Sequence, residues 1–316
     1  MKILITGGAG FIGTHLAERF CGRHEVVLFD NFRRDSLSLV PHLRENARLK
    51  LVTGDVLNAA SLEQACEGVD TVLHLAAIAG VRSYYEESLR TLQVNVLGTV
   101  NVLEAAAARG VRHFVHFSTS ETYGPDALWV HETSPHAIGP VSDRRWVYAT
   151  SKLAGEHFTL RTAEARKFKA TTVRPFNIYG PRQMGEGAVG NFCKAADAKL
   201  PLMVYGDGSA IRAWCYVTDM VDAVEAILNT PGAAGEIFNI GNPREVETTL
   251  GLARRVCELA PGTVIQYQPS QGAEVRARIP SIEKAHRLLG YEPKIDLKQG
   301  LQKTLAFFAQ KRRSAD

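Results

Sequence analysis

The sequence holds few cysteines, and their spacing matches no metal site. Its 316 residues include five cysteines, Cys21, Cys66, Cys193, Cys215 and Cys257, and no two of them form a CxxC pair. The ten histidines also show no ligand spacing, so we expect no metal. An odd, dispersed set of cysteines is typical of a reducing compartment, and we therefore expect a cytoplasmic protein.

Long hydrophobic runs and dense blocks of one charge are missing as well. The apolar run in "MKILITGGAGFIG" breaks at glycine, too early for a signal peptide or a membrane span. Net charge is +4, and basic residues are scattered apart from Lys311 to Arg313. A nucleic-acid arm is normally longer and denser, so we expect neither nucleic acid nor a membrane as a partner. The mildly basic surface suits an anionic small ligand such as a nucleotide.

Short apolar runs alternate with helical patterns in the first half of the chain. The predicted strands are Lys2–Thr6, Glu25–Asp30, Leu49–Asp55, Thr71–Ala77, His113–Thr119 and Ala170–Phe176. Helical patterns between them cover Thr14–Arg23, Ser61–Gly68 and Thr91–Gly110. The strands are almost continuously hydrophobic, which implies burial on both faces. This pattern predicts an α/β fold with a Rossmann-type doubly wound parallel sheet.

Beyond Pro175 the regular alternation of strands and helices ends, because proline and glycine separate shorter elements. We expect a smaller, irregular C-terminal region over residues 174–316, after a Rossmann domain over 1–173 that residues 214–241 rejoin. A helix is predicted for Tyr216–Thr230, with Thr218 or Asp219 as its N-cap.

A glycine-rich turn follows the first predicted strand. Gly7 and Gly10 would let the backbone turn tightly and approach a pyrophosphate, and Gly13 would let the next helix pack close to the strand. The helix N-terminus would attract the phosphate charge. A tight turn without a ligand is the alternative, but strand, glycines, helix, strand and terminal acid occur here in the order that a dinucleotide site requires.

The terminal acid is Asp30, whose carboxylate can accept hydrogen bonds from both hydroxyls of the adenosine ribose. It would repel a 2′-phosphate, so we predict NAD rather than NADP, although Arg33 and Arg34 follow closely and could offset the acid. Asp55, at the end of a later strand, could meet the adenine or cap the next helix.

"YATSK" places Tyr148 and Lys152 four residues apart, on one helix face. A phenol titrates near pH 10 in water, so it is a poor base at neutral pH unless a cation stabilises the phenolate. The Lys152 ammonium and the positive nicotinamide ring would supply that stabilisation. After a glycine-rich turn and a strand that ends in "STSE", this pair predicts a catalytic tyrosine.

Taken together, "GGAGFIG", Asp30, Asp55, "YATSK", "RPFNIYGPR" and "YGDGSAIRAWCYVTDMVDA" resemble the extended short-chain dehydrogenase/reductases, specifically the sugar-nucleotide epimerases and dehydratases. The resemblance spans essentially the whole chain. It implies that the Rossmann domain binds NAD and that the C-terminal region binds a nucleoside-diphosphate sugar. The remaining NAD-binding residues that it implies are Phe11, Ile12, Asn31, Val56, Leu75, Ala76 and Ala77.

In such enzymes the tyrosinate removes a proton from a sugar hydroxyl, usually at C4, while a hydride passes to NAD. Simple 4-epimerases carry small or hydroxyl residues where Ser120 and Glu121 stand. Many 4,6-dehydratases carry Thr-Asp-Glu, whereas this chain has Thr119, Ser120 and Glu121. The pattern Thr-Ser-Glu resembles the UDP-glucuronate decarboxylases.

Three further stretches resemble the same decarboxylases. "AAIAGVRSYYEESLR" resembles their sugar-binding loop and would place Tyr84 near the substrate, and "RRWVYATSK" resembles the Arg-Trp that precedes their tyrosine. "VRARIPSIEKAHRLLGYEPKIDL" resembles their C-terminal segment, in which Arg278 would lie beside the sugar carboxylate.

This resemblance implies a role for each polar residue at the strand end. Oxidation at C4 makes C6 the carboxylate of a β-keto acid, which can lose carbon dioxide without a metal. Arg278 would bind the carboxylate or help to return a proton at C5, and Thr119 and Tyr148 would polarise the enolate oxygen. Glu121 would orient the sugar or water and move protons, with a pKa set by burial among Ser118, Thr119 and Ser120. The alternative for Glu121 is a carboxylate that caps a helix or braces a loop.

The remaining positions that the resemblance implies concern the sugar nucleotide. Asn177 and Arg212 would hold its diphosphate, with Arg182 as a nearby candidate, and the backbone of Val204 and Tyr205 would cradle the base, which we expect to be a pyrimidine.

The leading hypothesis is decarboxylation of a UDP-hexuronate, most simply UDP-glucuronate, to a UDP-pentose or its 4-keto form. The alternatives are a UDP-sugar 4-epimerase, particularly of a uronate, then a 4,6-dehydratase, and a non-catalytic NAD-binding regulator. Family members commonly dimerise through two helices per subunit, so we expect a homodimer through "LQVNVLGTVNVLEAAA" and the helix of Tyr148. Packing against the sheet is the alternative for that apolar face.

Overall fold

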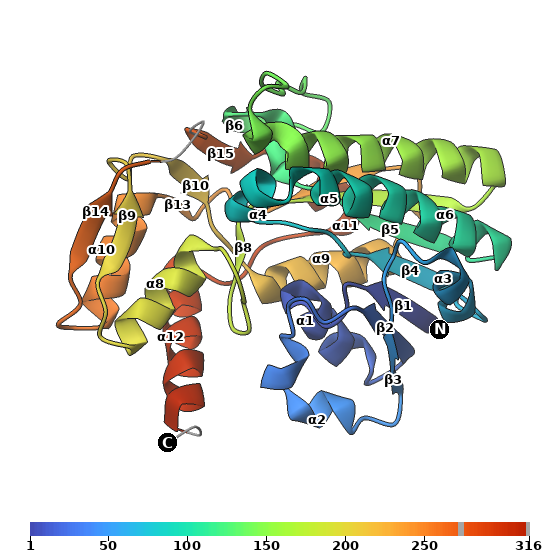
Figure 1. Cartoon of the computed structure of the whole chain (residues 1–316), viewed down its shortest axis with the longest axis horizontal. Helices are drawn as coiled ribbons and strands as arrows, with labels where there is room; N and C mark the ends of the chain where they lie inside the picture. The colour runs from blue at the N-terminus through green and yellow to red at the C-terminus, as the bar shows by residue number, and fades with distance from the viewer. Residues whose placement is uncertain (271–274, 314–316) are drawn as a thin grey trace.

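The structure, a computed structural model, describes residues 1–270 and 275–313, and its centre is a seven-stranded parallel sheet (Figure 1). The strand order is β12-β7-β5-β4-β1-β2-β3, with β1 and β4 in the middle. The strands are β1 (Lys2–Thr6), β2 (Glu25–Asp30), β3 (Leu49–Thr53), β4 (Thr71–His74), β5 (His113–Phe117), β7 (Lys169–Pro175) and β12 (Ile237–Ile240). The prediction of a Rossmann-type doubly wound sheet is confirmed.

All six predicted strands form, but four end earlier than predicted, and the last of them, β7, is shifted by one residue to Lys169–Pro175. β1 and β2 have the predicted bounds, whereas β3, β4 and β5 stop before Asp55, Ala77 and Thr119. The residues beyond each strand turn away from the sheet and line a large pocket. Burial on both faces was predicted for every strand and is wrong for β3. This strand lies at the sheet edge, and its Leu51 is 37% exposed.

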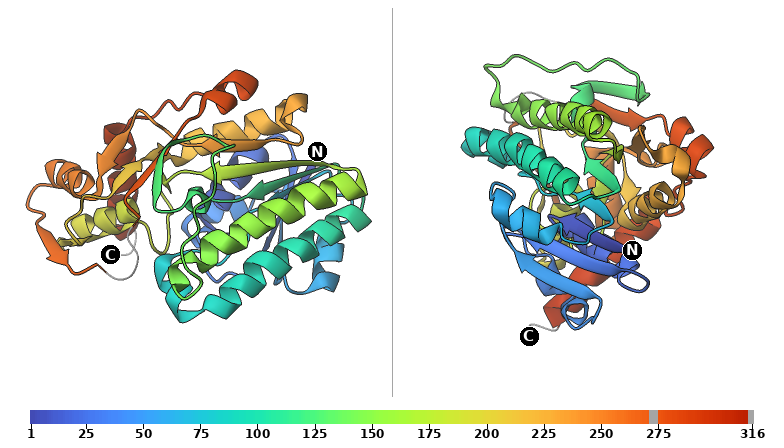
Figure 2. Two further views of the ribbon diagram at one scale, coloured as in Figure 1. Left: turned by 90° about the horizontal axis from the view of Figure 1, so that it is seen from above. Right: turned by 90° about the vertical axis from the view of Figure 1, so that its right-hand side faces the viewer.

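Helices cover both faces of the sheet, as Figure 2 shows for α6 and α7 on one side and for α1 and α9 on the other. One hydrophobic core joins Ile3, Ile5 and Leu73 to Leu16 of α1 and Val224 of α9. A second core, on the opposite face, is formed by other residues of the same strands and by α3 and α6. The helices in this part of the molecule are α1 (Phe11–Phe20), α2 (Pro41–Arg44), α3 (Ala59–Ala65), α4 (Val81–Glu86), α5 (Ser88–Leu92), α6 (Gly98–Ala108), α7 (Val147–Arg166), α9 (Val217–Asn229) and α11 (Glu283–Leu289).

Helix boundaries differ from the prediction where tertiary contacts decide them. The long predicted helix Thr91–Gly110 is divided into α5, a π-helical segment η2 (Gln93–Leu97) and α6. α9 begins after Tyr216, so the predicted N-caps Thr218 and Asp219 are wrong. The Asp219 carboxylate instead accepts hydrogen bonds from the backbone N–H groups of Lys294 and Ile295, at 3.0 and 3.3 Å. Short helical turns occur at η1 (Leu37–Leu39), η3 (Ser120–Tyr123), η4 (Arg144–Trp146) and η5 (Pro231–Ala233).

The smaller lobe has its own hydrophobic core and three small sheets. A four-stranded sheet has the order β13-β10-β15-β6, and two-stranded sheets pair β11 with β8 and β14 with β9. The strands are β6 (Asp126–Val130), β8 (Ile178–Tyr179), β9 (Leu202–Tyr205), β10 (Ile211–Ala213), β11 (Cys215–Tyr216), β13 (Val246–Thr248), β14 (Ile265–Gln268) and β15 (Ala277–Pro280). The helices are α8 (Ala188–Asp197), α10 (Thr249–Leu259) and α12 (Leu297–Arg313).

The two lobes exchange segments of chain. β6 lies within residues 1–173 but pairs with β15 in the smaller lobe, whereas β12 comes from the second half and pairs with β7 in the large sheet. The pocket is therefore built from both halves of the sequence. Among the described helices, none combines the length and the apolar character needed to cross a membrane.

Candidate active site

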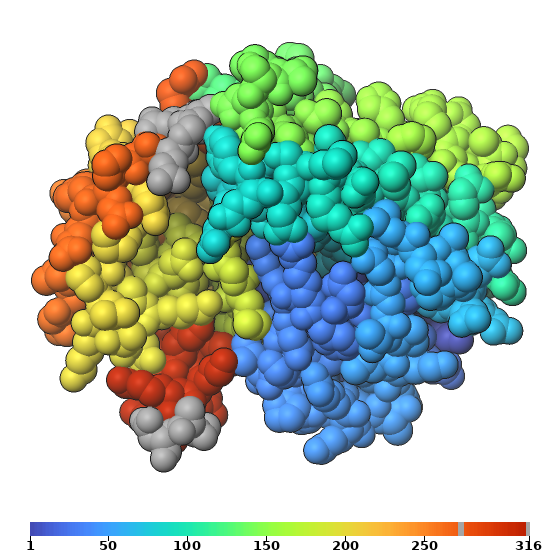
Figure 3. Space-filling model, viewed as in Figure 1, coloured from blue at the N-terminus to red at the C-terminus, as the bar shows by residue number. Residues whose placement is uncertain are grey.

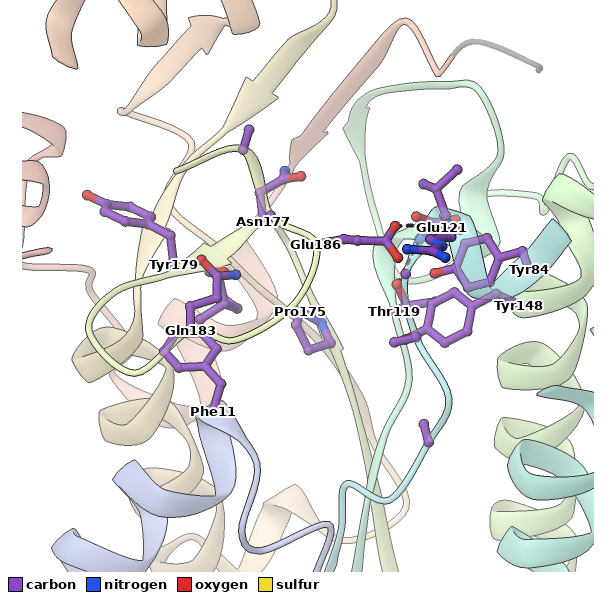
Figure 4. Close-up of a pocket in the computed structure, with 18 of the residues that line it drawn as sticks. Phe11, Tyr84, Thr119, Glu121, Tyr148, Pro175, Asn177, Tyr179, Gln183 and Glu186 are labelled. Atoms are coloured by element: carbon purple, nitrogen blue, oxygen red, sulfur yellow. Dashed lines mark hydrogen bonds between the residues drawn. The ribbon is translucent and has the colours of Figure 1, made fainter. Parts of the chain in front are cut away.

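A cavity of about 1720 Å³ lies at the carboxyl ends of the large sheet and extends to the small sheet of β10, β15 and β6. In Figure 3 the yellow surface of the smaller lobe meets the blue and cyan surface of the large sheet region along this hollow. Ligands of open α/β sheets bind at this end of the strands. Figure 4 shows Tyr84, Thr119, Glu121 and Tyr148 gathered in one part of the pocket, with Phe11, Asn177, Tyr179 and Gln183 in another.

The structure brings every residue predicted for the dinucleotide to this cavity. Its lining includes Gly7, Gly10, Phe11, Ile12, Gly13, Asp30, Asn31, Asp55, Val56, Leu75, Ala76, Ala77, Tyr148 and Lys152. The motifs lie far apart in the sequence, but the parallel strands end side by side, so the loops that follow them converge.

The glycine turn leaves no room for side chains. Gly7 has a φ of +71°, and a Cβ there would lie 2.7 Å from the backbone nitrogen of Ala76. A Cβ at Gly13 would lie 2.6 Å from the carbonyl oxygen of Gly7. Gly10 is the N-cap of α1. The turn therefore exposes backbone at a helix N-terminus, which is the arrangement that binds a pyrophosphate.

Asp30 is held at the end of β2 by two backbone donors. Its carboxylate accepts hydrogen bonds from the N–H groups of Ala9 and Phe32, at 3.0 and 2.7 Å. Burial raises its pKa, and no ion pair with Asp30 occurs within residues 1–270 and 275–313. An acid without a cationic partner at this position fits a ribose diol and disfavours a 2′-phosphate, so the residues present fit NAD.

The two nearby arginines do not neutralise Asp30. Arg33 forms a bidentate ion pair with Glu87, and Arg34 donates a hydrogen bond to the carbonyl oxygen of Ala79 at 2.6 Å. Both guanidinium groups are therefore bound elsewhere.

Asp55 lines the pocket, but it does not cap α3. Its carboxylate accepts hydrogen bonds from the backbone of Leu57 and from Arg90, each at 2.9 Å. The N-cap of α3 is Asn58, whose side chain accepts from the backbone of Ser61.

Tyr148 and Lys152 lie one turn apart on α7 and border the cavity. Burial and the Glu121 carboxylate raise the pKa of Tyr148, while a hydrogen bond with the Thr119 side chain acts in the opposite direction. Burial lowers the pKa of Lys152 to about 7, against the attraction of Glu156. In the protein alone, Tyr148 is thus a neutral phenol, and it needs additional positive charge nearby before it can act as a base.

Tyr84 packs face to face with Tyr148. Their ring centroids lie 5.0 Å apart and the rings are nearly parallel. The stack fixes the phenol of Tyr148 against the short helix α4.

Glu121 is clamped between two arginines. Arg145 donates to both carboxylate oxygens, at 2.5 and 3.1 Å, and Arg278 donates to one of them at 3.0 Å. Burial alone would raise the pKa of Glu121, but the two guanidinium groups lower it to about 2. Burial, which the sequence analysis expected to set this pKa, is the largest single influence on it, but two arginines from other elements together outweigh burial and reverse the direction.

Arg278 and Arg212 lie on adjacent strands at paired positions. Among the described residues, Nε and Nη2 of Arg278 have no hydrogen-bond partner, although both atoms are buried. Arg212 donates to the carbonyl oxygens of Ile211 and Val275, each at 2.8 Å, and burial lowers its pKa to about 9. Two guanidinium groups bind the Glu121 carboxylate and the third, that of Arg212, lies near it, which leaves this end of the cavity positively charged.

The other predicted substrate residues divide into two groups. Asn177 and Tyr205 line the cavity, as Tyr84, Thr119 and Ser120 also do. Val204 is fully buried in the core of the smaller lobe and does not reach the lining. Arg182 also does not reach it, because its guanidinium pairs with Glu18 of α1 at 2.6 Å.

Sequence reasoning missed two features of the site. It quoted Arg145 within "RRWVYATSK" but gave it no role, although its position three residues before Tyr148 was a usable signal. It also missed a buried ion pair behind the strand end, in which Arg174 contacts Glu156 through two hydrogen bonds and the hydroxyl of Ser118 donates to Glu156. Within the described part of the chain, no group of three or more His, Cys, Asp or Glu side chains could hold a metal ion.

The turn, the strand-end acid and the tyrosine–lysine pair meet in one cavity, and this combination defines an NAD-dependent enzyme of the extended short-chain dehydrogenase/reductase type that acts on sugar nucleotides. More particularly, the chain belongs to the NAD dependent epimerase/dehydratase family, whose sequence profile matches residues 3–241. The resemblance inferred from the motifs is confirmed.

Relatives within this family differ in reaction. UDP-glucuronic acid decarboxylase 1 of Arabidopsis thaliana is 36% identical over 313 residues, which are 98% of this chain and 70% of that protein. UDP-N-acetyl-alpha-D-glucosaminuronate decarboxylase of Bacillus cytotoxicus is 34% identical over 98% of both chains. The crystal structure of UDP-glucuronic acid 4-epimerase from Bacillus cereus with UDP-glucuronic acid and NAD has a TM-score of 0.90, at 30% identity, over 98% of this chain and all of that one.

Proposed function

We propose that the protein is an NAD-dependent decarboxylase of a UDP-hexuronate, with UDP-glucuronate as the first substrate to test. The observation that carries the proposal is the pair of buried, unbonded N–H groups on Arg278, which point to an anion that the folded chain does not itself provide. A guanidinium binds a carboxylate through two parallel hydrogen bonds, and Nε and Nη2 form one such edge. The names of the two decarboxylase relatives support the same reaction.

The residues around Tyr148 account for the chemistry. Tyr148, ionised with the help of Lys152, takes the proton of the C4 hydroxyl. Bound NAD supplies the acceptor for the hydride from C4, which leaves a ketone β to the carboxylate. The C5–C6 bond then breaks, carbon dioxide leaves, and the electron pair moves into an enolate whose oxygen Thr119 and Tyr148 stabilise. A proton from solvent adds to C5, which gives a UDP-4-keto-pentose. Return of the hydride to C4, together with the proton that Tyr148 took, would then give the UDP-pentose.

Glu121 is not the base in this scheme. A carboxylate whose pKa is held at about 2 by two arginines stays ionised and has little affinity for a proton. We infer that Ser120 and Glu121 shape the sugar site and that Asn177, Arg212 and Tyr205 contact the UDP group, since all of them line the cavity.

The test is incubation of the purified, NAD-loaded protein with UDP-glucuronate, UDP-N-acetylglucosaminuronate and UDP-glucose. Both uronates are tested because the Arabidopsis thaliana relative is named for UDP-glucuronic acid and the Bacillus cytotoxicus relative for UDP-N-acetylglucosaminuronate. We expect carbon dioxide from at least one uronate and a UDP-pentose product by mass spectrometry. Tyr148→Phe should lower kcat at least about a hundredfold while NAD still binds.

The second candidate is 4-epimerisation of UDP-glucuronate, which the structural likeness to the Bacillus cereus epimerase favours. Arg278 would then hold the carboxylate without its loss. Formation of UDP-galacturonate with no carbon dioxide would identify this reaction and refute the decarboxylase proposal.

We further propose that the protein is a homodimer. Large apolar side chains are exposed on the outer surface of neighbouring helical segments, at Leu89 of α5, Leu97 of η2 and Phe158 of α7. The inner residues of α6 pack against the sheet, so sheet packing and subunit contact use different faces of the same helices.

A further inference from the structure

Arg145 is a buried cation at the junction of three parts of the site. It is 5% exposed and lies in η4, immediately before α7, where its backbone N–H donates to the Asp143 side chain. Its guanidinium makes the bidentate contact with Glu121 and also lies 5.4 Å from the centre of the Tyr84 ring. Tyr84 in turn stacks on Tyr148. One side chain therefore contacts both the acid of the strand end and the partner of the catalytic tyrosine.

Glu121 has two cationic partners, and the two are not equivalent. Arg145 binds both carboxylate oxygens, whereas Arg278 binds one and retains two unbonded N–H groups. If Arg278 turns to the carboxylate of a substrate, Glu121 loses one partner. A buried carboxylate without a partner is strongly destabilised, so the exchange is feasible only because Arg145 remains bound.

We propose that Arg145 is a positioning residue that keeps Glu121 fixed and compensated, so that Arg278 is free to bind the carboxylate of a uronate substrate. This inference rests on the proposed function, since it requires a substrate with a carboxylate. It predicts that Glu121 becomes a competitor for Arg278 as soon as Arg145 is lost.

The other groups that face Glu121 do not replace Arg145. They are Arg278 on β15, Arg212 on β10, Tyr84 on α4, Tyr148 on α7 and the Thr119 hydroxyl before η3. Arg212 donates to backbone carbonyl oxygens, and the two tyrosines are neutral phenols whose pKa values the Glu121 charge raises further. Among residues 1–270 and 275–313, only Arg278 is left to compensate Glu121 directly once Arg145 is removed.

The experiment is titration calorimetry of NAD-loaded protein with UDP-glucuronate and with UDP-glucose, which lacks the carboxylate, at pH 5 to 8. Every protein compared also carries Tyr148→Phe, so that the ligand binds with little conversion, and in these titrations wild type means that Arg145 is retained. For Arg145→Met at pH 7.5 we expect the affinity for UDP-glucuronate to fall at least about tenfold, and that for UDP-glucose to change less than about threefold. Loss of the guanidinium raises the pKa of Glu121, so the affinity of the variant for UDP-glucuronate should recover as the pH falls, whereas the wild type shows no such recovery.

Two further variants test the mechanism. Arg145→Met combined with Glu121→Gln should regain affinity for UDP-glucuronate, because the competitor is neutral, and Arg145→Lys, with its charge retained, should lie between wild type and Arg145→Met. An equal loss for both ligands, or no recovery in the double variant, would overturn the inference and leave Arg145 as a packing residue. If Arg145→Met fails to fold, the pH profile of Arg145→Lys decides. The proposed function fails separately, when wild type releases no carbon dioxide from any uronate.

Discussion

The ion pair between Arg174 of β7 and Glu156 of α7 gives the sharpest stability prediction. Both side chains are almost fully buried, at 2% and 4% exposure. Two hydrogen bonds of 2.9 and 2.7 Å join them, and the Ser118 hydroxyl donates to the same carboxylate at 2.5 Å. Arg174→Met removes two of these three donors and leaves a carboxylate in the core with a single serine. Breaking a buried pair on one side costs about 3–5 kcal/mol, and we expect a loss of that size in the free energy of unfolding.

The matched control replaces both partners. Arg174→Met combined with Glu156→Met removes both charges of this pair, and apolar replacement of a whole buried pair is often nearly neutral. The Ser118 hydroxyl loses its acceptor in this double variant, so we expect a cost of about 1–2 kcal/mol, below that of the single change. Urea unfolding of wild type, both single variants and the double variant, followed by circular dichroism, yields the coupling energy.

The reasoning predicts a coupling energy of at least about 2 kcal/mol between positions 156 and 174. Additive losses, with coupling below about 0.5 kcal/mol, would refute it, because they would mean that each charge finds other partners when its own is removed. Arg174 also donates to the Tyr123 hydroxyl and to the carbonyl oxygen of Glu132 and lies 3.2 Å from the ring nitrogen of His136, and the buried Lys152 attracts Glu156. These neighbours could supply such compensation.

Two further predictions concern Lys152 and the subunit contact. Burial lowers the pKa of folded Lys152 from the ordinary 10.5 to about 7. Between these pH values the unfolded chain holds the proton and the folded chain does not, so this group makes the free energy of unfolding rise with pH. Lys152→Met lacks this pH dependence. Its stability advantage over wild type, measured by urea unfolding, should therefore shrink from pH 7 to 10. A constant difference would contradict the lowered pKa. Leu97→Glu on the exposed side of η2 should convert a dimer to a monomer by light scattering, whereas Leu128→Glu, at an exposed leucine of β6, should leave the mass unchanged.

The sequence allowed most of the large sheet to be predicted, because its strands are uninterrupted apolar runs. Lys2–Thr6 and Glu25–Asp30 were predicted to the residue. A glycine turn ends the first strand. The second ends at an acid, Asp30, which the structure shows to be held by backbone N–H donors. The ends of β3, β4 and β5 were predicted two or three residues too late, and that of β7 one residue too late. Residues such as Ala77 and Thr119 are compatible with a strand by type, and only the loops that form the cavity draw them away from it.

The parts of the site that follow from local spacing were also predictable. The glycine turn and the pair Tyr148 and Lys152 are each contained within a single element, so their geometry can be read from the order of residues. The ion pairs are different. Glu121 contacts Arg145 and Arg278 only because η3, η4 and β15 converge in the fold. The spacing of these residues in the sequence does not predict the two ion pairs.

Arg182 is the opposite case, a residue that the sequence placed in the site but whose side chain lies outside it. It belongs to a motif that faces the cavity, but its own φ of +70° and the acceptor at Glu18 direct its side chain to α1. A motif fixes which residues are near a site, whereas backbone conformation and available partners decide which of them point into it.

The strand β12 has a consequence for how the chain is made. It completes the edge of the large sheet beside β7, yet it is encoded far downstream of it. While the ribosome is still adding the intervening residues, β7 is an edge strand whose backbone donors and acceptors face water or another nascent chain. The nucleotide-binding half therefore cannot finish folding as an independent unit during synthesis. Its last strand arrives only after part of the smaller lobe has been synthesised, so the two lobes must complete their folding together.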